Sequence, residues 1–319
     1  MNYKIYSPQD FPAYLPKLNS LYDDLFSGGK GFRSKLIGLV SEPLKLEVST
    51  QTLLAQTIEF IHNASLLHDD LIDRSHLRRG KKTAWLKYTP EYAVLAGDYL
   101  LARVMVNLSS FGNIKLVQYT AEIISDLLEG EWLQDSVVGD YFVTLEQLDR
   151  IHHLKTASLF KWCLRSPFIA REDYTQDLHF VLGEMGAILG QLFQRSDDLL
   201  DYDIRNHEGK AVLGDLKSGY LNSVGAFMTR DLSRTQLDQV IKSSSLADLH
   251  LAFSSDPQKG KEIFDKKIAE FDQMNTKLID LYNHHLSTLD SLLNGDEKKL
   301  VNNLKPLTEI LYWRRKPSS

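Results

Sequence analysis

The chain has 319 residues, of which 43% are hydrophobic and 25% charged, and its formal net charge at pH 7 is −5. This composition supports a large folded core and excludes a disordered chain, while the negative charge argues against nucleic acid as a partner. The expected partner is therefore a small molecule or another protein. The single cysteine, Cys163, excludes an internal disulfide.

The sequence shows no targeting or membrane-spanning segment. The N-terminal MNYKIYSPQDFP lacks a basic stretch followed by an apolar run, and Asp98 and Arg103 interrupt the long apolar segment 93–108. A secretory signal needs the first pattern, and a bilayer span needs about 18 uninterrupted apolar residues. The sequence therefore predicts a soluble protein of the reducing cytoplasm.

Apolar residues recur three and four positions apart along most of the chain, which predicts long helices and no convincing strand. In chain order, helices are expected over residues 33–41, 50–73, 91–109, 115–135, 144–165, 174–204, 218–230, 262–290 and 296–314. Loops are expected at 27–31, 78–82 and 205–219, and a partly polar connection at 243–261. No stretch resembles a flexible linker, so residues 1–319 are interpreted as one all-α domain.

Two acidic clusters interrupt apolar helical segments. In DDLID, Asp69 and Asp73 are one helical turn apart, with Asp70 beside them. The pattern returns as DDLLD, whose acids are Asp197, Asp198 and Asp201. One such cluster is equally well explained as a solvated helix end, but the repetition favours two facing helices that form an oxygen-lined site for magnesium. Because magnesium usually shares its coordination with phosphate oxygens, a phosphate-bearing substrate is expected.

Basic residues near predicted loops and helix boundaries agree with this interpretation. They are Lys30, Arg33, Arg78, Arg79, Lys155 and Lys210. Arginine grips a diphosphate through two hydrogen bonds, and lysine supplies a point charge. Each of them taken alone is more simply an ordinary solvated side chain, so the interpretation depends on their joint positions.

Six stretches together resemble the trans-isoprenyl diphosphate synthases, the polyprenyl synthetase family, over roughly residues 28 to 219. They are GGKGFR, IHNASLLHDDLIDRSHLRRG, LAGDYLLAR, EGEWLQ, KTASLF and FQRSDDLLDYD. The resemblance implies the isoprenoid synthase fold, a bundle of long antiparallel helices around a central cavity, and a homodimer. It also implies a magnesium-dependent condensation of isopentenyl diphosphate with an allylic diphosphate, and transient membrane contact for product release.

The resemblance assigns roles to particular residues. Asp69, Asp73 and Asp197 would bind the magnesium ions that hold the allylic diphosphate, with Asp70, Asp198 and Asp201 supporting that metal site directly or through water. Arg78, Lys155 and Lys210 would grip the same diphosphate, and Lys30, Arg33, His62 and Arg79 would form the isopentenyl diphosphate pocket. Thr156 and Gln194 would line the region where the allylic cation forms.

The product length is expected to depend on the turn of helix before Asp69. Ala64 and Ser65 stand where relatives with short products carry bulky aromatic residues, so these small residues predict a deep tunnel and a medium or long all-trans product. Phe60, Ile61 and Thr57 are the next candidates to close the tunnel. Two alternatives remain open: small residues also pack helix crossings, and a short-chain (C15–C20) product is the second possibility.

Several positions depart from the family pattern. Gly31 replaces an arginine and Ser34 a proline, and Arg195 and Ser196 stand where apolar residues are common. In 215–225, Tyr220 occupies the position of a phosphate-binding lysine and Asn222 that of a threonine, and Lys217 is the nearest replacement cation.

Because of these departures, a non-catalytic subunit that regulates an active partner remains an alternative hypothesis. A class I terpene cyclase, which shares the fold and the first motif, is disfavoured by the second intact DDxxD.

Overall fold

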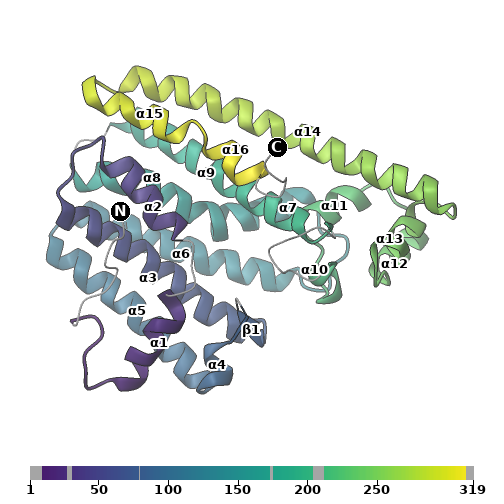
Figure 1. Ribbon diagram of the computed structural model, residues 1–319, viewed down its shortest axis with the longest axis horizontal. Helices are drawn as coiled ribbons and strands as arrows, with labels where there is room; N and C mark the ends of the chain where they lie inside the picture. Colours follow the sequence, from purple (N-terminus) through teal and green to yellow (C-terminus); the bar gives the residue numbers. More distant parts are fainter. Residues whose placement is uncertain (1–8, 27–30, 79, 173–174, 204–211, 314–319) are drawn as a thin grey trace. The chain divides into compact units, whose positions relative to one another are not determined.

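The computed structural model describes residues 9–26, 31–78, 80–172, 175–203 and 212–313, and most of these residues are helical (Figure 1). The chain divides into two compact units. Unit 1 contains residues 1–125, 159–183 and 292–303, and unit 2 contains residues 126–158, 184–291 and 304–319. The all-α fold class is confirmed, whereas a single domain over residues 1–319 stays a prediction.

Unit 1 is built around α3 (Val48–Ile72), which packs against its neighbours α2 (Phe32–Ser41) and α5 (Pro90–Phe111). The contact face of α3 is apolar, since Leu54, Ile58 and Phe60 are completely buried. Before α5, Thr89 accepts a hydrogen bond from the Tyr92 amide, and Pro90 occupies the first helical turn, as is typical of a helix start.

The remaining elements of unit 1 are mostly shorter. They are α1 (Pro16–Phe26), the antiparallel strands β1 (Leu77–Arg78) and β2 (Lys81–Lys82), α4 (Ala84–Lys87), the 3-10 helix η2 (Gly295–Lys298) and α15 (Lys299–Leu304). Parts of α6 (Ile114–Ser136), α8 (Ser158–Ala170) and α9 (Gln176–Leu200) also belong to this unit.

Unit 2 contains the other parts of α6 and α9 together with a set of shorter helices and one long one. They are α7 (Leu145–His152), the π-helical turn η1 (His153–Ala157), α10 (Gly214–Lys217), α11 (Ser223–Thr229), α12 (Arg234–Ile241), α13 (Leu246–Phe253), α14 (Pro257–Leu292) and α16 (Leu307–Tyr312). Helices α12 and α13 pack side by side (Figure 1).

The expected connection at 243–261 is wrong. Residues 246–253 form α13, and α14 already begins at Pro257. Ser245 caps α13 through a reciprocal pair of hydrogen bonds with Asp248, and Leu249 and Phe253 are buried. The polar, serine-rich appearance of the segment reflects helix caps.

Other boundaries differ from those expected. The helix expected at 218–230 covers only 223–229, because Asn222 caps its first turn. The helix expected at 296–314 divides into η2, α15 and α16 around Pro306, and β1 and β2 form a hairpin in the expected loop 78–82. Helix α8 continues through Pro167, and α1, α4 and α12 were not expected. The expected loop 205–219 is wrong in part, because α10 forms within it.

No helix in the described part of the chain is both long and apolar enough to cross a bilayer.

Candidate active site

The first aspartate-rich motif lies at the end of α3 in unit 1. Asp70 is 5% exposed, and Arg78 on β1 donates to its carboxylate, with 2.8 Å from Nε to each oxygen and 2.7 Å from Nη2 to Oδ1. Asp69 is half-buried, and Asp73, which ends the helix, is exposed. Asp70 is therefore the buried carboxylate of this motif, and Asp69 and Asp73 are more exposed.

A compact turn brings Arg78 back to Asp70. The Ser75 amide donates to the Asp70 carbonyl oxygen at 2.9 Å. The Ser75 carbonyl oxygen in turn accepts from the Thr83 hydroxyl at 2.7 Å and from the Trp85 indole at 2.9 Å. The hairpin β1–β2 lies between these anchored positions. Its register pairs Arg78 with Lys81.

The second aspartate-rich motif lies at the end of α9 in unit 2. Asp198 is 3% exposed, and its Oδ2 accepts from the Ser223 amide at 3.0 Å and from the Ser223 hydroxyl at 2.5 Å. Its Oδ1 accepts from Gln194 Nε2 at 2.9 Å. Asp201 is 2% exposed and accepts from the Gly214 amide at 2.7 Å, whereas Asp197 is half-buried.

The two motifs thus share one arrangement. In each, the second aspartate is buried and accepts hydrogen bonds from protein donors, and the first is more exposed. The chemistry of the accessible donors suits a hard divalent cation, because Asp69, Asp73 and Asp197 offer carboxylate oxygens. Within the described residues, no three acidic, histidine or cysteine side chains are already arranged around a common metal position. Magnesium typically takes only one or two carboxylates and completes its shell with phosphate and water oxygens.

Lys155 and Thr156 lie in the π-helical turn η1. Lys155 forms an ion pair with Glu131 of α6, and the Thr156 hydroxyl donates to Gln194 Oε1 at 3.1 Å. Thr156, Gln194 and Asp198 therefore form one hydrogen-bonded chain in unit 2. Gly130 allows this close packing, since a Cβ there would lie 2.9 Å from the Lys155 backbone nitrogen. Single π-helical turns are frequent at functional sites.

The residues expected to bind isopentenyl diphosphate are only partly described. Arg33 on α2 is half-buried, with its guanidinium 5.8 Å from the centre of the Phe160 ring, and His62 is half-buried on α3. Both belong to unit 1, as do Asp69 and Arg78. The remaining basic residues of the expected site, Lys30, Arg79 and Lys210, lie outside the described residues.

Comparison with known proteins decides the family. The family model described as "Polyprenyl synthetase" matches residues 15–253. The chain belongs to the polyprenyl synthetase family. The octaprenyl diphosphate synthase of Escherichia coli (strain K12) is 36% identical over 193 residues, which are 60% of this chain and 59% of that protein. The match thus spans less than two thirds of this relative's length.

Solved structures of family members share the fold. A decaprenyl diphosphate synthase from Rhodobacter capsulatus superposes with a TM-score of 0.81 at 26% identity, covering 96% of this chain and 92% of that one. A polyprenyl synthase from Caulobacter crescentus CB15, whose structure contains calcium and isoprenyl diphosphate, gives a TM-score of 0.74 at 25% identity, with 95% and 90% covered. The isoprenoid synthase type of fold expected from the sequence is confirmed.

Local structure explains two departures from the family pattern near α2. Gly31 precedes the helix with φ of +56°, a left-handed conformation that glycine adopts without strain. The Ser34 amide donates to Glu59 Oε1 at 3.2 Å, and its hydroxyl donates to the Gly31 carbonyl oxygen at 3.0 Å. A proline at position 34 has no amide hydrogen and would lose the first of these bonds.

The polar residues Arg195 and Ser196 hold α9 to other parts of unit 2. Arg195 is 3% exposed; its Nη2 donates to both Asp149 oxygens at 2.9 and 2.7 Å, and its Nη1 donates to Asn275 Oδ1 at 2.7 Å. Ser196 donates to the Tyr312 carbonyl oxygen at 3.0 Å. These two residues therefore have structural partners, which the sequence pattern did not indicate.

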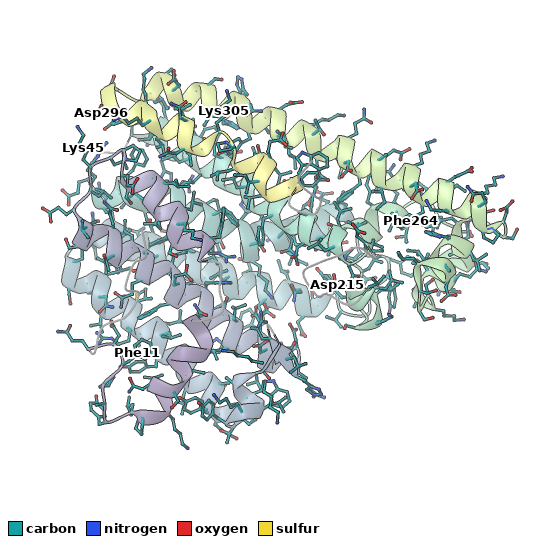
Figure 2. All side chains as sticks on the ribbon, viewed as in Figure 1. Phe11, Lys45, Asp215, Phe264, Asp296 and Lys305 are labelled. Carbon is teal, nitrogen blue, oxygen red and sulfur yellow. The ribbon has the colours of Figure 1, made fainter. Side chains whose placement is uncertain are left out.

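Tyr220 and Asn222 lie beside the second motif. Asn222 is fully buried, caps α11 by accepting from the Gly225 amide at 3.0 Å, and donates to Asp215 Oδ2 at 2.9 Å. Figure 2 labels Asp215, which lies in α10. Burial, and then the charges of Asp198, Asp215 and Glu131, raise the pKa of Tyr220, so its hydroxyl stays protonated. Sequence reasoning gave no role to Asp215 or Ser223, because single polar residues outside a motif carry no recognisable spacing.

Proposed function

We propose that this chain is a magnesium-dependent prenyltransferase that condenses isopentenyl diphosphate with an allylic diphosphate to give a medium or long all-trans polyprenyl diphosphate. The observation that carries the proposal is the shared arrangement of the two aspartate-rich motifs, each with a buried aspartate held by protein and a more accessible one. The names of its relatives, which include octaprenyl and decaprenyl diphosphate synthases, support a long product.

The chain's own groups would bind and hold the allylic diphosphate. Asp69, Asp73 and Asp197 would hold magnesium, which when bound neutralises the charge that develops on the departing diphosphate. Arg78 and Lys155, with Lys210, would contact the same diphosphate directly. Positive groups placed where negative charge develops lower the barrier to departure, so the reaction needs no protein nucleophile.

The buried aspartates would act by positioning. We infer that Asp70 orients Arg78, and that Asp198 fixes the end of α9 so that Asp197 faces the substrate. The hydrogen-bonded chain from Thr156 through Gln194 to Asp198 would hold η1 against α9. The double bond of isopentenyl diphosphate then attacks the allylic cation, and a proton leaves the adduct for the released diphosphate.

The test is to incubate the full chain with magnesium, labelled isopentenyl diphosphate and, separately, C5, C10, C15 and C20 allylic diphosphates. Sizing the dephosphorylated products should show chains longer than C20, and the rates should identify the primer. Products no longer than C15 to C20 would favour the short-chain alternative. No product with any primer would contradict the proposal.

Variants of the accessible aspartates test the metal assignment. Asp69→Asn and Asp197→Asn keep the size of the side chain but remove its charge, and turnover should fall by about three orders of magnitude or more, as expected when transition-state charge stabilisation is lost. Asp177→Asn is the matched control, because Asp177 is exposed and lies on the same helix as Asp197. Normal turnover in both motif variants would refute the metal assignment.

A non-catalytic subunit is the second candidate, and the observation that favours it is Tyr220. Its uncharged hydroxyl occupies the place of the family's phosphate-binding lysine, which removes one positive charge near the second motif. In that case the purified chain would bind an active synthase and alter its product while making none itself. The primer assay described above separates this candidate from an active enzyme.

We also propose a homodimer that involves α6. Leu128 and Trp132 are 53% and 79% exposed and lie one helical turn apart, so they present an apolar surface. Trp132→Glu should convert the dimer to a monomer in size-exclusion chromatography with light scattering, whereas a monomeric unaltered protein would contradict the proposal. The cytoplasmic location and transient membrane contact stay predictions.

A further inference from the structure

The short segment before α1 is fastened to both α3 and α5 by Asp10. This aspartate is 2% exposed, although it stands near the start of the chain. Its Oδ1 accepts from Arg103 Nε and from Asn107 Nδ2, each at 3.0 Å, and its Oδ2 accepts from Gln56 Nε2 at 2.5 Å. Asp10 therefore gives this segment a defined place in unit 1.

Phe11 follows Asp10 and is 3% exposed. Its ring meets that of Phe60 on α3 edge to face, with ring centres 5.9 Å apart and an interplanar angle of 87°. Phe60 is completely buried. Phe11 lies in the segment that leads into α1 (Figure 2). The Phe11 ring therefore packs against Phe60, which is one of the residues expected to close the tunnel.

Both contacts fall on the stripe of α3 that carries Ala64. Gln56, Phe60 and Ala64 are four residues apart and so lie on one face of the helix. With a rise of about 1.5 Å per residue, Phe60 lies about 13 Å along the axis from Asp69, and Gln56 about 20 Å. The segment at Asp10 and Phe11 thus contacts the same face of α3 as Ala64, but farther along the helix axis from the aspartate-rich motif.

We propose that Phe11, held in place by Asp10, closes the far end of the space that receives the growing prenyl chain and so limits product length. The inference rests on the proposed function. An apolar product grows from the diphosphate along the Ala64 face and stops where aromatic rings fill the space. A simple packing contact would need only Phe11. The three hydrogen bonds to Asp10 also fix the position of the neighbouring Phe11 ring.

Product sizing tests the proposal with the full chain, magnesium and the primer that the unaltered protein prefers. Phe11→Ala should shift the main product upward by one isoprene unit or more, and Phe11→Leu should give a smaller shift. Asp10→Ala removes no apolar surface but releases the segment, so it should shift the product in the same direction. Phe253→Ala is the matched control, because Phe253 is a buried aromatic residue of unit 2 whose ring contacts that of Phe264.

Circular dichroism melting of each variant shows whether the compared proteins are folded. If Phe11→Ala is unfolded, the comparison is made with Phe11→Leu instead. Unchanged product length in Phe11→Leu and Asp10→Ala, with a normal product from the unaltered chain, would overturn this inference alone. A longer product from Phe253→Ala as well would also overturn it, since any loosened core would then have the same effect. No product from the unaltered chain would instead remove the proposed function, and this inference with it.

Discussion

Arg78 and Asp70 are joined by a short, nearly symmetric contact, in which Arg78 Nε lies 2.8 Å from both carboxylate oxygens of Asp70. The carboxylate is almost completely buried, whereas the arginine side chain is 37% exposed. The arginine thus reaches outward from a fixed base. Asp70 therefore holds one edge of the guanidinium through charge-assisted hydrogen bonds, and the rest of the arginine side chain remains accessible to a ligand.

Arg78→Lys should weaken substrate binding more than it weakens the fold. Lysine keeps the charge but cannot form the arginine's planar set of hydrogen bonds, so the KM for the allylic diphosphate should rise by about tenfold, equivalent to roughly 1.4 kcal/mol. Steady-state kinetics measure this change, and the exposed Arg74→Lys is the control. An unchanged KM would mean that Arg78 serves Asp70 alone.

Tyr220→Lys should strengthen binding of the allylic diphosphate. The replacement puts a positive charge where Asp198, Asp215 and Glu131 influence the present hydroxyl, and it restores the family's usual residue. We expect the KM for the allylic substrate to fall several-fold. This corresponds to a gain in binding free energy of about 1 kcal/mol or less, because the neighbouring carboxylates partly neutralise the added charge. Tyr220→Phe, which removes only the hydroxyl, is the control. A higher KM in Tyr220→Lys would show that the tyrosine has a positive role of its own.

Ala64→Phe should shorten the product. Ala64 is completely buried on α3, and a ring there would fill the space that the proposed function assigns to the growing chain. Inserting a ring into a packed core also costs about 1–3 kcal/mol, so the melting temperature should fall. Product sizing beside the volume-conserving Ala64→Ser separates the two effects. Shortening in both variants, or in neither, would contradict the prediction.

Stability should decrease on acidification below about pH 6.5, because two histidines resist protonation in the folded state. Burial lowers the pKa of His152, and burial followed by the charge of Arg165 lowers that of His179 to about 4. The unfolded chain takes up these protons near pH 6.5 while the folded chain does not, so lowering the pH stabilises the unfolded state relative to the folded state.

Melting curves at pH 7.5 and 5.5 check this prediction. Between pH 7.5 and 5.5, the melting temperature of His152→Gln should fall by less than that of the unaltered protein. His284→Gln is the control, because His284 is exposed. An equal loss in the His152 variant and the unaltered protein would assign the pH dependence to other groups.

The sequence alone determined the helical class, the family and the identity of the two aspartate-rich motifs. These conclusions depend on local signals: the three-and-four spacing of apolar residues, and short motifs whose members are close along the chain. The same local rules misassigned 243–261, because serines that cap helices look like loop residues when their hydrogen bonds are not visible. Similarly, Pro167 is compatible with a helix that the sequence pattern alone would have ended earlier.

Only the tertiary structure decided which aspartate of each motif is buried. Asp69 and Asp70 are neighbours with the same chemistry, and what distinguishes them is the return of Arg78 through the hairpin to Asp70. In the second motif, Ser223 distinguishes Asp198 from Asp197 across 25 residues of chain. The anchoring of Asp10 by Arg103 and Asn107 spans more than 90 residues. Such contacts depend on how helices pack, and packing follows from the whole set of side chains rather than from any local pattern.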